Sequence, residues 1–271
     1  MSKDIEMIHK ELLILLENFH KLCVQNGIKY SLHGGTLLGA IREKGFIAWD
    51  DDADITMDRE NFDKFCLLMK TIKLSRGFAF VDINRFPQFV MKRNGCPVVW
   101  ADIFVYDYIS EKQFVQRLKM AGTKFFILMT RTISDQRMSN LNGLYKGVNK
   151  FFINALVYMS QIIPYRFRIR LAKWFMKQLQ GNKSFVHRSN DTRVGSSMVL
   201  PAAINTHYIL TNFEDKKLMI VKDYDTVLKS SYGISYMTPR KDKPDAMHAI
   251  TLKKEQDEME VFVKEYMNLA E

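Results

Sequence analysis

Cysteine is scarce in this chain of 271 residues. Its three cysteines, Cys23, Cys66 and Cys96, lie far apart, and none of them forms a Cys-x-x-Cys pair. An odd number of scattered cysteines excludes a disulfide framework and a zinc knuckle as the basis of the fold. Free thiols are typical of a reducing compartment, so we expect a cytoplasmic protein.

The chain also lacks an apolar stretch that could cross a membrane. The longest uncharged run in its basic middle part, 151–163, has thirteen residues and ends before Pro164, whereas a transmembrane helix needs about 20. A secretory signal is not expected either, because Asp4, Glu6 and Glu11 interrupt the first apolar residues. We therefore expect nothing to be cleaved from the N-terminus.

Acidic residues are almost missing from residues 117–181. This segment holds twelve Lys and Arg residues and one acid, Asp135, while the whole chain has a net charge of +10. It is also rich in Phe, Ile, Leu and Met, which favours a surface that meets anionic lipid. A helical subdomain with its apolar faces packed and its cations in solvent explains the same pattern. Both interpretations remain open from the sequence.

Apolar spacing and turn signals predict an α/β (α+β) fold, in which helices flank a mixed sheet. We expect a catalytic core in 1–116, a basic amphipathic helical segment in 117–181, and a C-terminal part, 182–271, that completes the domain. Helices are predicted at 5–24, 37–43 (capped by Thr36), 58–70 and 223–230, strands at 30–33, 52–57, 78–83, 88–92 and 98–109, and a loop-rich stretch from 182 to 201.

Two glycines separate the first predicted strand from the second helix. Gly34 and Gly35 would let the backbone come close to a phosphate, which the N-terminus of the helix would then hold with its N–H groups. By itself this signal is weak, since a tight turn needs the same residues. His33, which precedes them, is interpreted as a structural hydrogen-bonding residue.

Three aspartates alternate along the next predicted strand. Asp50, Asp52 and Asp54 would project to one side, while Ala53 and Ile55 face the core. Carboxylates held this close repel one another, and a divalent cation such as Mg²⁺ relieves that repulsion. The sequence therefore indicates a metal site, with a chance acidic turn as the alternative.

A later strand supplies a candidate for a third carboxylate. Asp102 lies within an otherwise apolar strand, where an unpaired charge would be costly to bury. Asp107 is nearer the strand's end, where solvent or a turn explains it, so Asp102 is preferred. The histidines, His248 among them, show no spacing that suits a zinc site.

The wording HGGTLLGAIREKGFIAWDDDADI at 33–55 resembles the LicD family of phosphotransferases, within the nucleotidyltransferase superfamily. The resemblance is strong over 30–60, moderate over 98–109 and 208–250, and absent from the basic segment. Ile234-Ser235 and Arg240 depart from the family's C-terminal pattern, and both lie in the half of the chain that we assign to the acceptor.

This resemblance implies a nucleotidyltransferase-type fold and the transfer of phosphocholine from CDP-choline, with release of CMP, onto a sugar of a surface glycan, lipopolysaccharide or teichoic acid. Relatives move ribitol phosphate or similar groups instead. It also implies two Mg²⁺ or Mn²⁺ ions that neutralise the donor's diphosphate. The residues it suggests are Asp52, Asp54 and Asp102, with Asp50, for the metal ions, Gly34, Gly35, Thr36, Arg42 and Lys92 for the donor, and Trp49, Trp100 or Tyr106 for a choline headgroup.

If the basic segment meets lipid, the enzyme lies on the inner face of the cytoplasmic membrane, where a lipid-linked glycan acceptor would be presented. Two other classes compete with this reading. A nucleotidyltransferase acting on RNA or a small molecule would use the basic segment to bind phosphate, but its apolar content suits lipid better, so no nucleic-acid partner is expected. A non-catalytic interaction protein of the same fold is disfavoured because the carboxylates are all present.

Overall fold

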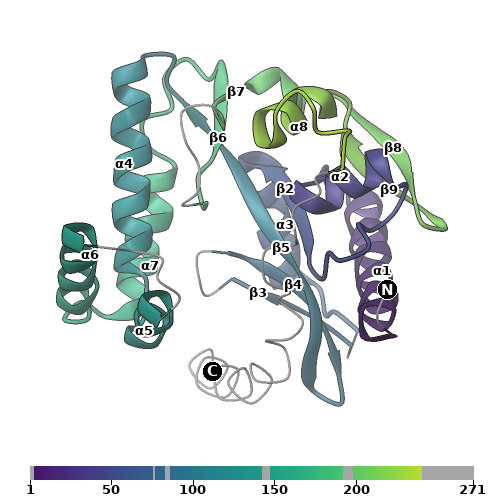
Figure 1. Cartoon of the computed structure of the whole chain (residues 1–271), viewed down its shortest axis with the longest axis horizontal. Helices are drawn as coiled ribbons and strands as arrows, with labels where there is room; N and C mark the ends of the chain where they lie inside the picture. Colours follow the sequence, from purple (N-terminus) through teal and green to yellow (C-terminus); the bar gives the residue numbers. More distant parts are fainter. Residues whose placement is uncertain (1–2, 76, 83–85, 142–146, 192–197, 240–271) are drawn as a thin grey trace. The chain divides into compact units, whose positions relative to one another are not determined.

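The computed structural model of the chain describes residues 3–75, 77–82, 86–141, 147–191 and 198–239. It confirms the predicted fold class, an α/β arrangement with helices flanking a mixed sheet (Figure 1). The helices are α1 (Lys3–Gln25), α2 (Gly34–Arg42), α3 (Arg59–Thr71), α4 (Gln113–Met129), α5 (Ile133–Leu141), α6 (Gly147–Ser160), α7 (Tyr165–Met176) and α8 (Tyr224–Tyr232), with a short 3-10 helix η2 (Ala202–Asn205).

Seven strands form the main sheet, in the order β1-β2-β5-β4-β3, with β6 paired to β5 and β7 paired to β6. A separate antiparallel pair consists of β8 and β9. The strands are β1 (Ser31–Leu32), β2 (Ala53–Asp58), β3 (Phe78–Val81), β4 (Gln88–Arg93), β5 (Cys96–Ile109), β6 (Phe185–Arg188), β7 (Leu200–Pro201), β8 (Tyr208–Phe213) and β9 (Lys216–Val221).

The chain divides into two compact units. Unit 1 comprises 1–83, 87–104 and 203–271, and unit 2 comprises 84–86 and 105–202. The boundary therefore falls within β5. Both limits predicted for the basic helical segment, 117 and 181, lie inside unit 2, which also takes in the end of β5 and the strands β6 and β7.

The core of unit 1 is built around one aromatic residue of α1. The ring of Phe19 lies 5.1 Å from Tyr30, 5.3 Å from Phe65 and 5.3 Å from Phe89. These four side chains come from α1, the residue before β1, α3 and β4, and all are fully buried. Each aromatic ring buries a large apolar area, so this cluster fixes both helices against the sheet.

The C-terminal hairpin joins unit 1 through β1. The backbone amide of Val221 donates to the hydroxyl of Ser31 at 3.0 Å, and that of Met219 donates to the Tyr30 hydroxyl at 3.3 Å. Residues distant in sequence thus pack on the N-terminal strand.

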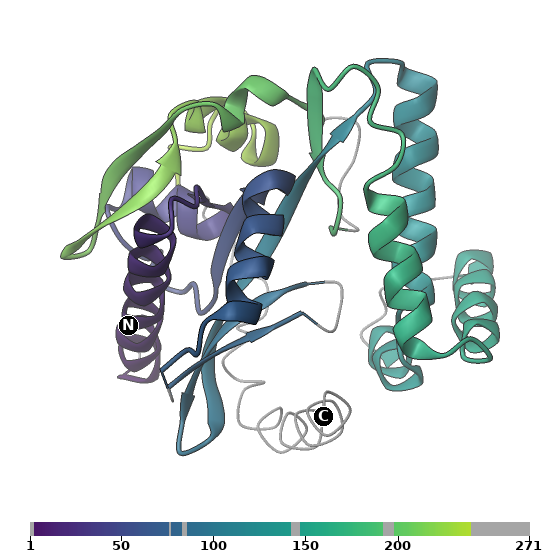
Figure 2. The same cartoon turned by 180° about the vertical axis from the view of Figure 1, so that it is seen from behind.

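Unit 2 contains the four helices of the basic segment. Helices α4 and α7 run side by side in both views (Figures 1 and 2), and α6 packs on α4. Between them Ile127, Ala172 and Met176 form a small buried core. The helical nature of the segment was predicted correctly, and no helix in the described ranges is long and apolar enough to cross a membrane.

Several predicted boundaries were wrong. Helix α2 begins at Gly34 and not at Leu37, because the hydroxyl of Thr36 bonds to the next strand and does not cap the helix. Strand β2 begins at Ala53, so Asp52 lies just before it. The stretch 182–201 was expected to be loops but contains β6 and β7.

The β8–β9 hairpin was not predicted at all. Glu214, at its turn, has a φ of +52°, a value that Gly or Asn usually takes. Because a glutamate stands there, the sequence carries no hairpin signal. Arg240 and His248 lie outside the described residues, as does Lys146 of the basic segment.

Candidate active site

The glycine pair and the aspartates are brought together where β1 leads into α2. The backbone amide of His33 donates to the carbonyl of Asp54 at 2.9 Å, which continues the pairing of β1 with β2. The backbone amide of Asp54 donates to the hydroxyl of buried Thr36, also at 2.9 Å. The start of α2 is thereby tied to β2 at Asp54. The structure gives Thr36 this positioning role.

The two glycines face carboxylates. A β-carbon built on Gly34 would overlap the carboxylate of Asp54, with the Asp54 Cγ atom 3.4 Å away. A β-carbon on Gly35 would overlap that of Asp50, with the Asp50 Cγ atom 3.2 Å away. Gly34 also has a φ of +54°, which disfavours a side chain. Glycine is therefore required at both positions for the aspartates to approach α2.

Asp50 and Asp52 form a close pair of carboxyl groups. Burial, followed by the charge of Asp52, a hydrogen bond to Asp52 and the charge of Asp51, raises the pKa of Asp50 to about 8. A carboxyl group with a raised pKa holds a proton near neutral pH unless a cation stabilises its charged form. The pair therefore has the electrostatic character of a site for positive charge.

Asp54 alternates with core positions as predicted. Its neighbours Ala53 and Ile55 are fully buried, whereas Asp54 itself is partly exposed. On the adjacent strand Asp102 is likewise partly exposed between buried Ala101 and Ile103. Both acids thus occupy positions turned away from the core on neighbouring strands.

Asp102 has a hydrogen-bonding partner across the sheet. The side-chain amide of Gln88, directly opposite on β4, donates to Asp102 Oδ1 at 2.8 Å. This contact lowers the cost of an acid within an apolar strand. Gln88 was not singled out from the sequence, although its place in the pairing strand makes it a natural partner.

The loop that leads to Asp50 is held from two sides. Glu214 accepts a hydrogen bond from the backbone amide of Phe46 at 3.0 Å, and its own amide donates to the carbonyl of Lys44 at 2.7 Å. From α1, His9 stacks on Phe46 with ring centroids 4.5 Å apart, and its Nε2 lies 2.6 Å from the Asp50 carbonyl oxygen. The sequence predicted no role for either His9 or Glu214.

Arg42 and Lys92, the two basic residues predicted to bind the donor, lie toward the far ends of α2 and β4. Arg42 ends α2, eight residues from Gly34, or about 12 Å of helix. It pairs with Glu43 at 2.6 Å and donates to the carbonyl of Tyr236 at 3.4 Å. Lys92 is four residues from Gln88, or about 13 Å along β4. A role of Arg42 and Lys92 at the donor stays a prediction.

The aromatic residues named for a choline group differ in accessibility. Trp49, next to Asp50, is 42% exposed. Trp100 is partly buried on β5, and Tyr106 is buried in unit 2, where burial raises its pKa to about 12. Trp49 therefore offers the most accessible ring beside the acids.

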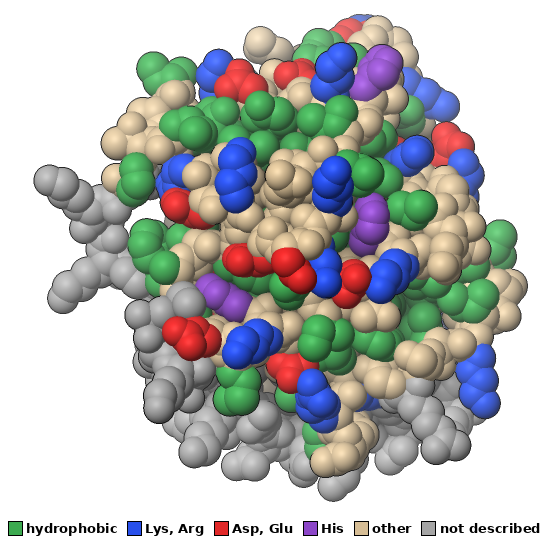
Figure 3. Space-filling view, turned by 90° about the vertical axis from the view of Figure 1, so that its right-hand side faces the viewer, with side chains coloured by type: hydrophobic (Ala, Val, Ile, Leu, Met, Phe, Trp, Pro, Cys, Tyr) green, Lys and Arg blue, Asp and Glu red, His purple; other side chains and the backbone are tan. Residues whose placement is uncertain are grey.

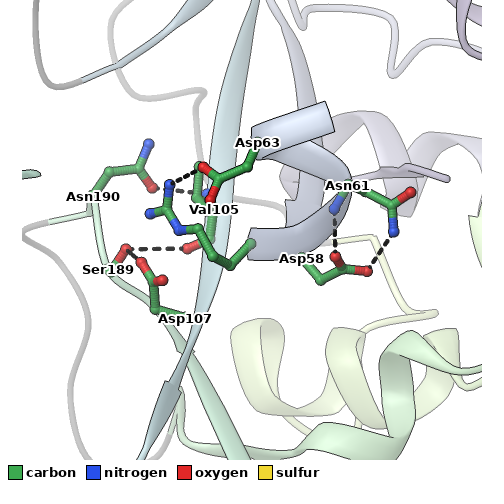
Figure 4. Close-up of polar contacts among 8 residues, drawn as sticks. Asp58, Asn61, Asp63, Val105, Asp107, Ser189 and Asn190 are labelled. Atoms are coloured by element: carbon green, nitrogen blue, oxygen red, sulfur yellow. Dashed lines mark hydrogen bonds and ion pairs between the residues drawn. The ribbon is translucent and has the colours of Figure 1, made fainter. Parts of the chain in front are cut away.

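Asp107 has a structural environment, so solvent at a strand end is the wrong explanation for it. It is buried, and the hydroxyl of Ser189 donates to its carboxylate (Figure 4). The next residue, Asn190, accepts from the backbone amide of Val105 at 2.9 Å. His187 opposite Asp107 is also buried, and burial followed by the charge of Lys119 lowers its pKa to about 3.

Within the residues that the structure describes, no group of three or more His, Cys, Asp or Glu side chains is arranged to hold a metal ion. The individual donors have the right chemistry, since Mg²⁺ prefers carboxylate oxygens and the carboxyl groups of Asp50 and Asp52 are close enough to interact. The ligand set Asp52, Asp54 and Asp102 remains a prediction.

The family described as LicD/FKTN/FKRP, nucleotidyltransferase domain, matches residues 27–181, which is more than half of the chain. The match includes 33–55, which carries the sequence resemblance. It also runs through the basic segment, so the expectation that the likeness is absent there was wrong. Residues 208–250 lie outside the matched range.

Among curated proteins, the lipopolysaccharide cholinephosphotransferase LicD of Haemophilus influenzae is 57% identical over 53 residues, which are 20% of each chain. An uncharacterized protein of Rickettsia prowazekii is 26% identical over 168 residues, 59% of this chain and 62% of its own. One of Rickettsia typhi is 41% identical over 59 residues, 22% of this chain and 19% of its own. The chain thus matches only part of the length of these relatives.

Proposed function

Because this chain belongs to the LicD/FKTN/FKRP family of nucleotidyltransferase domains, we propose that it transfers phosphocholine, or a related phospho-alditol group, from a CDP-activated donor to a sugar, with release of CMP. The acceptor would be a cell-surface glycan, either a lipopolysaccharide or a teichoic acid. The relative from Haemophilus influenzae is named for cholinephosphotransferase activity on lipopolysaccharide. The observation that carries the proposal is the approach of Asp50 and Asp54 to the side-chain-free start of α2.

Each part of this site has a distinct task in the proposal. Asp52, Asp54 and Asp102 would hold Mg²⁺ or Mn²⁺, which supplies positive charge to the donor's diphosphate. Thr36 and the backbone of β1 keep Asp54 in position. Asp50 lies between Gly35 and Asp52 and has a raised pKa, so it is suited to hold the proton that the acceptor hydroxyl gives up.

The headgroup of the donor requires a different kind of contact. A quaternary ammonium cannot donate a hydrogen bond, and it binds best over an aromatic ring. Trp49 is the accessible ring next to the acids, so we assign it to the choline group. A ribitol phosphate donor would not need this ring, since its hydroxyl groups can hydrogen-bond.

The function is tested by measuring CMP release from CDP-choline with Mg²⁺, with CDP-ribitol and ATP run in parallel. We expect CMP from a CDP-linked donor and no pyrophosphate from ATP. Asp54→Asn should lower the rate by at least about a hundredfold, because it removes charge from the site while keeping its shape. Asp63→Asn, an exposed acid on α3, serves as the matched control and should leave the rate unchanged.

Two results would contradict the proposal. Release of pyrophosphate from ATP, with no CMP from either CDP donor, would make the protein a nucleotidyltransferase. A normal rate in Asp54→Asn, with normal thermal unfolding, would place the chemistry elsewhere. Trp49→Ala should weaken CDP-choline binding several-fold and leave CDP-ribitol binding unchanged.

A further inference from the structure

The turn between α6 and α7 presents large apolar side chains to solvent. Met159, near the end of α6, is 69% exposed, Ile162 in the turn is 87% exposed, and Phe167 in the first part of α7 is 55% exposed. They fall within nine residues of one another, so they lie close in space. A patch of this kind on a soluble surface usually marks a contact with a partner or a membrane.

The apolar surface continues along α6. Phe151 and Phe152, at 70% and 65% exposed, both lie about two helical turns before Met159. The helical repeat places Phe151, Phe152 and Met159 on one side, and buried Val157 and Ser160 on the other. One side of α6 therefore packs on unit 2, and the opposite side is apolar and uncovered in the described structure.

Cations flank the turn, and acids are missing from both helices. Helices α6 and α7 contain no Asp or Glu. On α7, Arg166 and Arg170 are exposed on the side that also carries Phe167, and Lys177, the residue after the helix, is exposed as well. Trp174 is on this side as well and is an aromatic residue of the kind enriched at membrane interfaces.

The turn is held in shape by a buried arginine. Arg168 donates to the carbonyl of Met129 at 2.7 Å, to the Ser160 hydroxyl at 3.2 Å and to the side-chain oxygen of Gln161 at 3.1 Å. It thereby ties the turn to the end of α4 while its neighbours Arg166 and Arg170 remain outside. Backbone amides within the turn are also bonded, that of Ile162 to the Met159 carbonyl at 3.3 Å. Satisfied backbone groups are what an apolar medium demands.

We propose that the α6–α7 turn, extended by the outer side of α6, docks on an anionic lipid surface. The apolar side chains would enter the boundary between headgroups and acyl chains, and Arg166 and Arg170 would contact the phosphates. Whatever binds this surface must carry negative charge to complement these cations. A second copy of the chain would bring the same cations to the turn, so an anionic lipid surface fits better. The face of unit 1 in Figure 3 differs, because acidic and basic side chains are interspersed on it.

Buried cations contribute nothing to this surface. Arg168 and Lys119 are 4% and 0% exposed, and the ammonium group of Lys119 donates to the carbonyl of Tyr108. A charge reversal that includes Arg168 would break the fold of unit 2 and so could not test lipid binding. The variants must be taken from Arg166 and Arg170.

The test is co-sedimentation of the full chain with vesicles of phosphatidylcholine alone and of equal phosphatidylcholine and phosphatidylglycerol. We expect binding that needs phosphatidylglycerol. At 0.5 M salt the Debye length is roughly 4 Å, so binding should be weakened by screening of the charges but should not vanish. Met159→Ser with Ile162→Ser should lower partitioning by about tenfold or more. Arg166→Glu with Arg170→Glu should lower it by a similar factor.

Matched controls come from unit 1. Met7→Ser with Leu67→Ser changes two apolar side chains that are 60% and 64% exposed, and Lys73→Glu with Lys217→Glu reverses two exposed cations. Both should bind vesicles like the wild type. Thermal unfolding should show that all four double variants remain folded.

The proposal is overturned if the wild type ignores the anionic vesicles, or if the controls lose as much binding as the turn variants. It is also overturned if sedimentation velocity shows a dimer that only Met159→Ser with Ile162→Ser dissociates, since the turn then contacts a second copy. Vesicle binding does not depend on the proposed activity. Asp54→Asn should bind lipid normally, which keeps a failure of one proposal distinct from a failure of the other.

Discussion

Replacing Gly35 with alanine should separate the stability of the fold from the geometry of the site. The backbone of Gly35 does not have a positive φ, so alanine introduces no backbone strain there. Alanine favours a helix over glycine by about 1 kcal/mol. The obstacle to the new methyl group is the carboxylate of Asp50, whose Cγ would be 3.2 Å away.

The size of the effect follows from that obstacle. The carboxylate has to move by on the order of 1 Å, and turning a side chain off its rotamer costs about 1 kcal/mol. This cost roughly cancels the gain in helix propensity, so the free energy of unfolding should change by less than about 1 kcal/mol. A misplacement of about 1 Å in a catalytic group costs on the order of a hundredfold in rate.

The assay compares CMP release with the thermal unfolding of the same preparation. Gly39→Ala is the matched control within α2, because a β-carbon there would meet the carbonyl of Gly45 and lie 3.3 Å from the amide nitrogen of Ile47. Backbone atoms cannot turn aside, so Gly39→Ala should lose about 1–3 kcal/mol of stability. If Gly35→Ala keeps its rate, or loses stability as Gly39→Ala does, the carboxylate next to Gly35 has no part in the chemistry.

Three further predictions concern single side chains. Glu214→Ala should lower kcat several-fold and the free energy of unfolding by about 1 kcal/mol, because the amide of Phe46 loses its acceptor. Glu214→Gln keeps an acceptor oxygen and should restore much of both quantities. Equal losses in the two variants would rule out the hydrogen bond as the cause. In metal-free protein, the raised pKa of Asp50 means that the folded state keeps a proton that the unfolded state releases, so stability should fall as pH rises from about 4 to about 8. Asp50→Asn should flatten that part of the unfolding profile, and an unchanged slope would contradict the assignment. Arg168→Met should lower the free energy of unfolding by about 3 kcal/mol, since buried carbonyls lose their donor. Arg170→Met should change it by no more than about 0.5 kcal/mol. Similar losses in both variants would show that the hydrogen bonds of Arg168 do not stabilise the turn.

The sequence by itself determined the local elements of the catalytic unit and the positions of its acids. The helical repeat of α1 and the alternation in β2 and β5 are properties of neighbouring residues, and their predicted positions agree with the structure to within a few residues. The glycines and aspartates at 33–55 also lie within one short stretch of the chain, joined by α2 and the loop that follows it.

Contacts between distant residues were decided only by the tertiary structure. The support that Glu214 and His9 give to the loop before Asp50 joins residues from both ends of the chain, and no local pattern announces it. The basic segment shows the same limit. Its composition gives the charge. Only the packing shows that Arg168 is buried and hydrogen-bonded to the Met129 carbonyl, while Arg166 and Arg170 face solvent. Exposure depends on what the rest of the chain places against a side chain, and a helical repeat fixes only which residues share a side.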